Sequence, residues 1–254
     1  MHIEDSVVLI TGGASGLGEA CARRLAAQNA GVVIMDPDQR RGAVLAEALG
    51  GRAHYYAVDV CDSQTIQTAL DRALDAFGKI NAVVNCAGVA PAAKVVGKHG
   101  PMDIEAFSTV IGINLIGTMN VIRLAAPHLM ENAPGPDGER GVVINTASIA
   151  AFEGQVGQAA YSASKAGVVG LTLPLAREMA RHGIRVVTIA PGLFDTPMMA
   201  ALPEKVRLDM ARIVPMPQRL GRPAEFAALA VHIIENTMLN GETIRLDGAL
   251  RMGG

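Results

Sequence analysis

Aromatic side chains and cysteines are scarce in this sequence of 254 residues. Tryptophan is absent, and aromatic residues make up 3% of the chain, which argues against a binding module built on aromatic rings. The three cysteines, Cys21, Cys61 and Cys86, are odd in number and spaced like neither a disulfide framework nor a zinc site. We therefore expect no metal centre, and a reducing compartment: the cytoplasm, or the mitochondrial matrix if the source is eukaryotic.

A strong charge bias and long apolar runs are also missing. The formal net charge is −2, so no general electrostatic attraction to nucleic acid or to an anionic membrane is expected. No apolar run reaches the roughly 18 residues of a membrane span. The first run begins at Ser6, which leaves no room for a cleavable signal segment. Hydrophobic residues nevertheless make up 50% of the chain, enough for a sizeable core.

Short, mostly β-branched runs alternate with longer helical patterns along the chain. The runs are nearly continuous, which is typical of parallel strands buried on both faces; they are 7–10, 32–35, 53–58, 80–85, 142–147, 184–190 and 242–246. The helical patterns are 16–30, 38–50, 62–77, 103–132, 158–182 and 223–236. This alternation predicts an α/β fold, a doubly wound parallel sheet with helices on both faces, in one domain over 1–254. Residues 193–222 lack a clean period, and such a long irregular stretch is usually functional.

A glycine-rich turn, TGGASGLG, follows the first strand at 11–18. Glycines at 12, 16 and 18 would let the backbone approach a pyrophosphate, and the next helix would present free N–H donors. The spacing is not G-x-G-x-x-G, so an ordinary glycine turn is the alternative. The turn alone does not decide between the two.

Two carboxylates end the second and third predicted strands. Asp36 could accept hydrogen bonds from both hydroxyls of an adenine ribose and would repel a 2′-phosphate, which favours NAD over NADP. Its alternative role is to cap the next helix, which Asp38 could also do. Asp59 could accept from an adenine amino group, with helix capping as an equal alternative, although Asp62 is better placed for that.

The segment AAYSASKAGVVG (159–170) places Tyr161 and Lys165 four positions apart, hence on one face of a helix. A neighbouring ammonium stabilises a phenolate and lowers its pKa, so Tyr161 could exchange a proton with a carbinol or carbonyl oxygen. Ser148, at the end of the strand VVINTAS, could hold the same oxygen. Each residue also has an ordinary structural reading, but together they fit hydride transfer coupled to proton transfer.

These motifs, with NCAG (85–88), Asn114 and PGLFDT (191–196), resemble the short-chain dehydrogenase/reductase family over nearly the whole chain. The resemblance implies a Rossmann-like fold, Tyr161 as acid/base, Lys165 as its cation, Ser148 on the substrate oxygen and Asn114 ordering a water beside Lys165. Cys86 stands where many members carry a second Asn. The implied NAD-binding residues are Gly12, Ser15, Gly16, Leu17, Gly18, Asp36, Asp59, Val60, Asn85, Ala87, Gly88, Tyr161, Lys165, Pro191, Gly192 and Thr196. Of these, the resemblance implies that Gly192 and Thr196 meet the nicotinamide and its carboxamide.

Within the family, the stretch from GERG (138–141) to PMM (197–199), together with NGETIRLDGALRM (240–252), is similar to the type II 3-hydroxyacyl-CoA dehydrogenases. That similarity implies oxidation of a 3-hydroxyacyl-CoA, with 193–222 as a substrate-binding lid. Gln155 and Gln158 could bind the thioester carbonyl, or simply lie in a solvated loop. Alternative functions are a steroid or other secondary-alcohol dehydrogenase, or a dinucleotide-binding scaffold without catalysis.

The predicted helix 158–182 is apolar or small around most of its circumference. A helix of that kind is normally buried, so we expect its outer face to pack against the same helix of a second subunit. By resemblance to the family, the assembly would be a homotetramer. The alternative is that loops of the same chain cover the helix.

Overall fold

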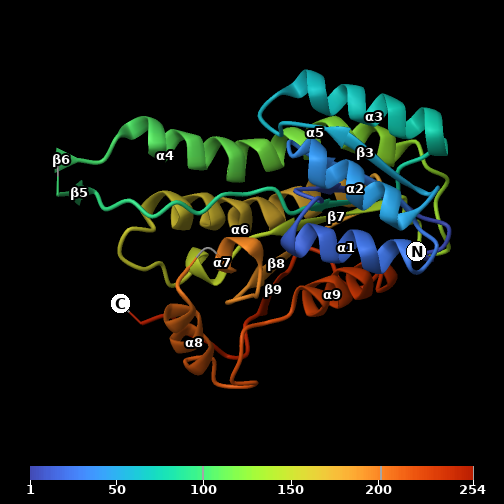
Figure 1. Cartoon of the computed structure of the whole chain (residues 1–254). Coiled ribbons are helices and arrows are strands. Elements are labelled where there is room, and N and C mark those ends of the chain that lie inside the picture. The colour runs from blue at the N-terminus through green and yellow to red at the C-terminus, as the bar shows by residue number, and fades with distance from the viewer. Residues whose placement is uncertain (99, 201, 254) are drawn as a thin grey trace.

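The computed structural model describes residues 1–98, 100–200 and 202–253, and it is built on one seven-stranded parallel sheet (Figure 1). The strands are β1 (Val7–Thr11), β2 (Gly31–Asp36), β3 (Ala53–Ala57), β4 (Ala82–Asn85), β7 (Gly141–Thr146), β8 (Ile184–Pro191) and β9 (Thr243–Leu246). Their order is β3-β2-β1-β4-β7-β8-β9, and every neighbouring pair is parallel. The predicted doubly wound sheet is confirmed, with small shifts at the strand ends.

Burial of the strands follows their position in the sheet. Every residue of β1, β2, β4 and β8 is buried, whereas β3 and β9, at the two edges, are only partly buried. Along β1, Val8 and Ile10 join the hydrophobic cluster on one face, and Val7 and Leu9 join the cluster on the other. Two apolar faces explain why the strand sequences are continuously hydrophobic rather than alternating.

Helices cover both faces of the sheet (Figure 1). One cluster contains residues of α1 (Gly16–Ala26), α2 (Gln39–Leu49) and α9 (Pro223–Glu235). The other contains residues of α3 (Ser63–Phe77), α5 (Gly117–Met130) and α6 (Ala159–Ala180). These six helices correspond to the predicted helical patterns, of which the one at 103–132 is divided.

The predicted helix 103–132 begins as α4 (Ile104–Ile111), passes through a π-helical turn, η1 (Gly112–Ile116), and continues as α5. A Cβ atom added to Gly117 would lie 2.5 Å from the Val60 side chain, so glycine lets this part of the helix approach the end of β3. By length and composition alone, Ile104–Met130 could cross a membrane, but 50% of its most apolar window is buried inside the protein. Its buried residues pack on the sheet, which accounts for its apolar composition.

The irregular segment 193–222 leaves the sheet after β8 and returns to its starting point. It contains α7 (Pro197–Ala200) and α8 (Glu204–Arg212), and its ends are joined where Gly221 N donates to the Leu193 carbonyl at 2.8 Å. Several of its apolar side chains are exposed, namely Met198, Leu202, Val206, Leu208, Ile213 and Met216. Ala201, which belongs to the predicted lid, lies outside the described residues. Gly254, which belongs to the predicted domain, also lies outside them.

A short hairpin and a 3₁₀ turn have no counterpart in the predicted pattern. The strands β5 (Val96–Gly97) and β6 (Gly100–Pro101) form an antiparallel hairpin that projects at one end of the molecule (Figure 1). A 3₁₀ turn, η2 (Ile149–Ala151), follows β7. Elements of two or three residues are too short to produce a periodic sequence signal.

Candidate active site

The carboxyl ends of the parallel strands meet along one edge of the sheet, and the predicted site residues lie there. Asp36 ends β2, Asn85 ends β4 and Pro191 ends β8, while Ser148 lies just beyond the end of β7 at Thr146. In open α/β sheets this edge is where ligands bind. The topology therefore brings together residues that are distant in the sequence.

The glycine turn needs its glycines for backbone packing. A Cβ atom on Gly12 would lie 2.8 Å from Ala87 N, and one on Gly18 would overlap the Gly12 carbonyl oxygen. Gly16 has a φ of 56°, in the left-handed region that favours glycine. Ser15 is the N-cap residue of α1, and its side chain makes no capping hydrogen bond. The positive end of α1, which starts at Gly16 and Leu17, therefore faces the turn, as pyrophosphate binding requires.

Asp36 is held by two backbone donors. Its Oδ2 accepts from Ala14 N at 3.1 Å, and its Oδ1 accepts from Asp38 N at 2.9 Å. The capping role falls to Asp38, which accepts from Arg41 N at 3.0 Å. The Asp36 carboxylate is therefore fixed beside the glycine turn, and each oxygen keeps a lone pair for a ribose hydroxyl.

Asp59 and Val60 lie just beyond the end of β3. The Asp59 side chain is exposed and accepts from Cys61 N at 2.9 Å, and Asp62 caps α3 by accepting from Gln64 N at 2.8 Å. Val60 is buried, and its carbonyl accepts from Asn120 Nδ2 at 2.9 Å. Capping by Asp62 leaves Asp59 exposed at the ligand edge, in a local turn.

The NCAG segment joins three strands. Asn85 Nδ2 donates to Asn145 Oδ1 at 2.9 Å, and Ala87 N donates to Thr11 Oγ1 at 3.2 Å. A Cβ atom on Gly88 would lie 3.1 Å from Asn114 Oδ1 and 3.4 Å from Lys165 Nζ. Glycine therefore leaves room for these two polar groups under the segment.

Cys86 is the residue of NCAG that departs from the family pattern, and its thiol contacts Thr146 and Cys21. It accepts a hydrogen bond from Thr146 Oγ1 at 3.6 Å. A hydrogen bond from the Cys21 thiol lowers the pKa of Cys86, and the same contact raises the pKa of Cys21. Both thiols are free, so the substitution is accommodated by a polar contact between β4, β7 and α1.

Ser148 and Tyr161 come together at the end of β7. Ser148 caps η2, where its Oγ accepts from Ala150 N at 3.1 Å, and it is largely buried. Tyr161 lies in the first turn of α6. Burial raises the pKa of Tyr161, and a hydrogen bond with Ser148 partly opposes that rise. The hydroxyl groups of both residues can therefore reach one substrate oxygen.

Lys165 lies one helical turn after Tyr161, with Nζ 5.9 Å from the centroid of the Tyr161 ring. Its Nζ donates to the Thr146 carbonyl at 2.7 Å, and burial lowers the pKa of Lys165 to about 8. The expectation that Lys165 lowers the pKa of Tyr161 is wrong. Burial of the phenol raises the pKa of Tyr161, and the group that opposes this rise is Ser148 rather than Lys165.

Asn114 is fully buried in the π-helical turn. Its amide exchanges two hydrogen bonds with the Val89 backbone, at 2.8 and 2.9 Å, and donates to Ser164 Oγ at 3.0 Å. The side chain thus ties the loop after β4 to α6, one residue before Lys165. Ordering of a water by Asn114 remains a prediction.

The segment after β8 lies against the glycine turn. Gly192 N donates to the Leu246 carbonyl at 3.0 Å, and a Cβ atom on Gly192 would lie 2.9 Å from Asp247 Cα. The Thr196 side chain lies 3.6 Å from the position of a Cβ on Gly16. The predicted nicotinamide and pyrophosphate segments are therefore neighbours at the sheet edge.

The two glutamines hold their own loop. Gln158 Oε1 accepts from Gln155 N at 2.9 Å, and Gln155 Nε2 donates to the Gly253 carbonyl at 3.4 Å. These contacts favour the structural reading over the substrate-binding one. A contact with a thioester stays a prediction.

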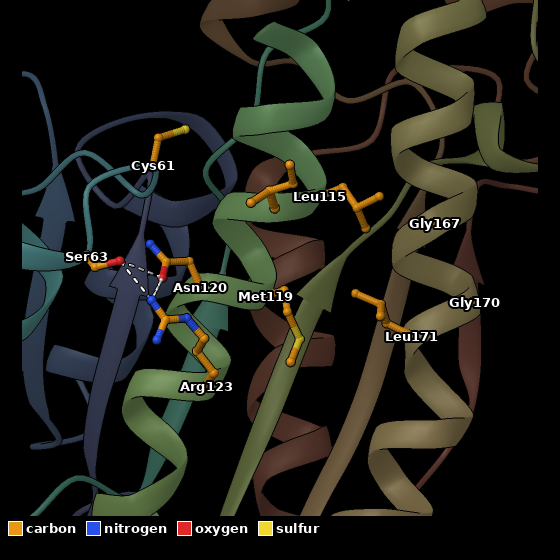
Figure 2. A pocket seen from close by; sticks show the side chains of 10 residues that line it. Cys61, Ser63, Leu115, Met119, Asn120, Arg123, Gly167, Gly170 and Leu171 are labelled. Atoms are coloured by element: carbon orange, nitrogen blue, oxygen red, sulfur yellow. Dashed lines mark hydrogen bonds between the residues drawn. The ribbon is translucent and has the colours of Figure 1, made fainter. Parts of the chain in front are cut away.

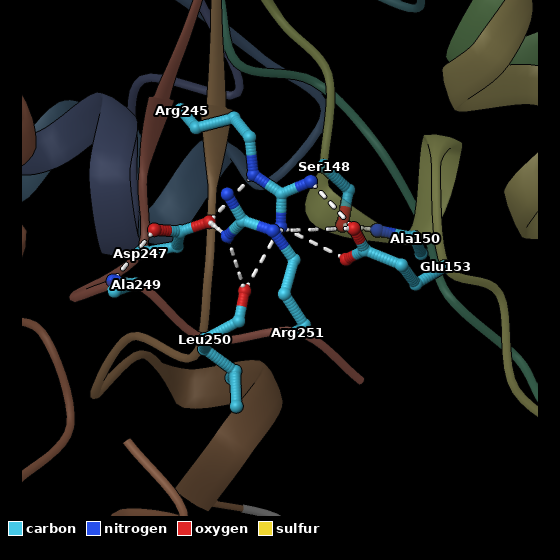
Figure 3. A network of polar contacts seen from close by, with 8 residues as sticks. All are labelled: Ser148, Ala150, Glu153, Arg245, Asp247, Ala249, Leu250 and Arg251. Carbon is cyan, nitrogen blue, oxygen red and sulfur yellow. Dashed lines mark hydrogen bonds and ion pairs between the residues drawn. The ribbon is translucent and has the colours of Figure 1, made fainter. Parts of the chain in front are cut away.

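Sequence reasoning missed an ionic network beside Ser148. Arg245 of β9 pairs with Glu153, which follows η2, and with Asp247, which follows β9 (Figure 3). The first pair is separated by 92 positions, and no pattern in the sequence connects them.

Comparisons with known proteins agree on one family. A family model described as short chain dehydrogenase matches residues 6–207. The 3-hydroxyacyl-CoA dehydrogenase type-2 of Drosophila melanogaster is 54% identical over 98% of this chain and 99% of its own, and the Homo sapiens protein of that name is 54% identical over 98% and 97%. The crystal structure of that enzyme from Mycobacterium avium matches with a TM-score of 0.94 and 42% identity, covering 99% and 98% of the two chains. A Brucella melitensis 3-ketoacyl-(acyl-carrier-protein) reductase complexed with NADH matches with a TM-score of 0.86 and 31% identity, over 96% and 97%.

Proposed function

This chain belongs to the short-chain dehydrogenase family, and we propose that it uses NAD to oxidise the 3-hydroxyl group of 3-hydroxyacyl-CoA thioesters. It is an oxidoreductase of that family. The observation that carries the proposal is the meeting of Ser148, Tyr161 and Lys165 at the ligand edge, opposite the glycine turn and Asp36. Relatives named for the proposed substrate match nearly the whole chain.

The residues present fit NAD. The glycine turn is a cradle that a Cβ atom on Gly12 or Gly18 would fill, and Asp36 offers a fixed carboxylate at the end of β2. A carboxylate here accepts from ribose hydroxyls and repels a 2′-phosphate, which argues against an NADPH-dependent reductase. Bound NAD supplies the hydride acceptor.

The proton step belongs to the residues of the chain. Ser148 orients the substrate hydroxyl, and Tyr161 Oη removes its proton as the hydride leaves the carbinol carbon. Lys165 holds its ammonium near the Tyr161 ring and is itself oriented by the Thr146 carbonyl. A chain that served only as a dinucleotide-binding scaffold would not need this constellation. A steroid or another secondary alcohol could use the same residues and is the second candidate substrate.

We assign 193–222 to the acyl chain of the substrate. The segment leaves the edge at Leu193 and returns at Gly221, and its exposed apolar side chains, such as Met198 and Leu208, could cover an acyl chain. The free thiols are compatible with the proposed reducing compartment.

A substrate panel tests the proposal. NAD reduction is measured with 3-hydroxybutyryl-CoA, a branched hydroxyacyl-CoA, estradiol and simple secondary alcohols. We expect the highest kcat/KM for a 3-hydroxyacyl-CoA with NAD, and a much lower value with NADP. A higher kcat/KM for estradiol than for the acyl-CoA thioesters would identify a steroid as the substrate instead. If no compound of the panel is turned over, the role as a dinucleotide-binding scaffold without catalysis is favoured.

We also propose that the chain is a homo-oligomer, a tetramer by resemblance to its family. An open groove of about 620 Å³ lies between η1 and α5 on one side and α6 on the other (Figure 2). It is lined mainly by apolar and small residues, including Leu115, Ile116, Met119, Gly167 and Gly170. Ile116 and Leu173 are 60% and 44% exposed in the single chain. A second copy of α6 could enter the groove and bury these side chains.

Light scattering at micromolar concentration tests the assembly. We expect a mass of several chains for the wild type and smaller species for Leu173→Glu, because a charge would be buried at the interface. Val44→Glu puts the same charge on α2, at a side chain that is 63% exposed, and is the control that should leave the mass unchanged. A wild-type mass of one chain would refute the interface.

A further inference from the structure

We propose that Arg245 is a positioning residue that sets the distance between the substrate hydroxyl held by Ser148 and the nicotinamide side of the site, acting through Glu153 and Asp247. The inference rests on the proposed role of Ser148. The three residues lie outside the catalytic constellation, and they join two of its parts.

The Ser148 side of the connection is a continuous hydrogen-bonded turn. Ala150 N donates to Ser148 Oγ at 3.1 Å and Ala151 N donates to the Ser148 carbonyl at 3.0 Å. Glu153 N donates to the Ile149 carbonyl at 3.0 Å. Because these bonds overlap along η2, a displacement of Glu153 is transmitted to the Ser148 hydroxyl.

Arg245 holds Glu153 in a bidentate pair (Figure 3). Nη1 donates to Glu153 Oε1 at 2.7 Å and Nη2 donates to Oε2 at 2.8 Å. The guanidinium carbon also lies 5.2 Å from the ring centroid of Phe152, the preceding residue. The planar fork and the ring together fix both the position and the tilt of the turn.

The same guanidinium reaches the cofactor side. Its Nε donates to Asp247 Oδ2 at 2.7 Å, and its Nη2 also donates to the Leu250 carbonyl at 2.9 Å. Asp247 is the residue against which Gly192 packs, since a Cβ on Gly192 would lie 2.9 Å from Asp247 Cα and Cβ. Arg251 adds a second cation to Asp247 at 3.1 Å. One side chain therefore spans the Ser148 turn and the segment predicted to contact nicotinamide.

Packing supports the same connection. Ile149 of the Ser148 turn shares a small buried cluster with Leu250 of the C-terminal tail and Val214 of the 193–222 segment. The polar network and this cluster hold the turn from two sides. Removal of the network alone should therefore loosen the turn without unfolding the sheet.

The test is a double-mutant cycle of Arg245→Met and Ser148→Ala, measured as kcat on the substrate that the wild type turns over best. We expect Arg245→Met to lower kcat roughly tenfold with NAD affinity unchanged, since residues in one network couple by about that much. In the Ser148→Ala background, the same change should cost less than about twofold, because no hydroxyl is left to position. Equal losses in both backgrounds would overturn the proposal.

Two further variants separate positioning from stability. Glu153→Gln keeps the size of the side chain and should reproduce part of the loss. It should also move the rise of oxidation rate to higher pH, because the Ser148 hydrogen bond that holds down the pKa of Tyr161 weakens. Glu139→Gln breaks a carboxylate pair with Arg185 at the opposite end of the sheet and should lower Tm with unchanged kcat. An unshifted pH profile in Glu153→Gln counts against the proposal.

The outcome is independent of the substrate assignment. If no 3-hydroxyacyl-CoA is oxidised, the proposed substrate is wrong. The double-mutant cycle is then measured with the alcohol that the enzyme does oxidise. If Ser148→Ala leaves kcat unchanged, there is nothing for Arg245 to position and the inference fails, whatever the substrate.

Discussion

In the nucleotide half of the ligand edge, built on β1 to β3, the side chain of Asp36 makes only short-range hydrogen bonds, whereas side chains of the catalytic half, built on β4 to β9, reach far along the chain. The Asp36 carboxylate is held by residues 2 and 22 positions away. In the catalytic half, Asn114 reaches Ser164 over 50 positions, and Arg245 reaches Glu153 over 92. Local contacts leave a spacing that can be read in the sequence, whereas distant contacts do not.

The two halves also differ in the role of their ionisable groups. Burial changes the pKa of Tyr161 and of Lys165, which are the groups proposed to move the proton. Asp36 and the glycine turn instead offer lone pairs and N–H donors in a fixed geometry. The nucleotide half should therefore govern binding, and the catalytic half should govern rate and pH dependence.

The largest expected effect is on turnover in the catalytic half. Tyr161→Phe removes the proton path and should lower kcat by about 10²–10⁴-fold, the usual contribution of general acid–base catalysis. NAD binding, measured by titration calorimetry, should change little. Tyr56→Phe, on the edge strand β3, is the control and should keep its kcat. A Tyr161→Phe variant with more than about a tenth of the activity would contradict the assignment.

The next effect is on stability as a function of pH. Lys165 has a pKa of about 8 in the folded protein and about 10.4 when unfolded. Between these values the unfolded chain binds more protons, so raising the pH stabilises the wild type. Relative to Lys165→Met, which does not titrate, the free energy of unfolding should rise by on the order of 3 kcal/mol from pH 7 to pH 10.5. Urea unfolding of both proteins at each pH measures this difference in the free energy of unfolding. If the free energies of the two proteins change with pH in parallel, the Lys165 ammonium is not desolvated.

A third effect sharpens the structural role of the nucleotide half. Gly18→Ala places a Cβ on the Gly12 carbonyl oxygen and should destabilise the protein by about 1–3 kcal/mol, as overpacking does, while also weakening NAD binding. Gly51→Ala, where nothing lies within 4 Å of the added Cβ, is the matched control and should leave Tm and NAD binding unchanged. Equal Tm values for the two variants would mean that the glycine turn accommodates the added Cβ atom without loss of stability.

The smallest effect is on cofactor choice. Asp36→Ala should weaken NAD binding roughly tenfold, because hydrogen bonds to a charged group are lost, and it should narrow the preference over NADP. Asp38→Ala removes the cap of α2 and an exposed ion pair with Arg41, and it should leave the NAD to NADP ratio of kcat/KM unchanged. If the wild type has the same kcat/KM with NAD and with NADP, Asp36 does not discriminate between the two cofactors at the adenine ribose.

Much of the fold and part of the site could be predicted from the sequence. The continuous Val and Ile runs indicated strands buried on both faces, and the glycine turn and Asp36 followed from the spacing of one strand–turn–helix unit. Tyr161 and Lys165 could be paired because both lie on one helix. The direction of the Tyr161 pKa shift could not be predicted, since it depends on what buries the ring.

The sequence by itself determined the order of strands and helices, the backbone freedom of the turn and the chemistry available at the strand ends, because each depends on neighbouring residues. Only the tertiary structure decided that Asn114 lies in a π-helical turn bound to Val89, that Lys165 is oriented by Thr146, and that Arg245 joins the Ser148 turn to Asp247. These contacts form only when a parallel sheet brings the ends of distant strands to one edge, since the separation along the chain carries no information about the distance in space.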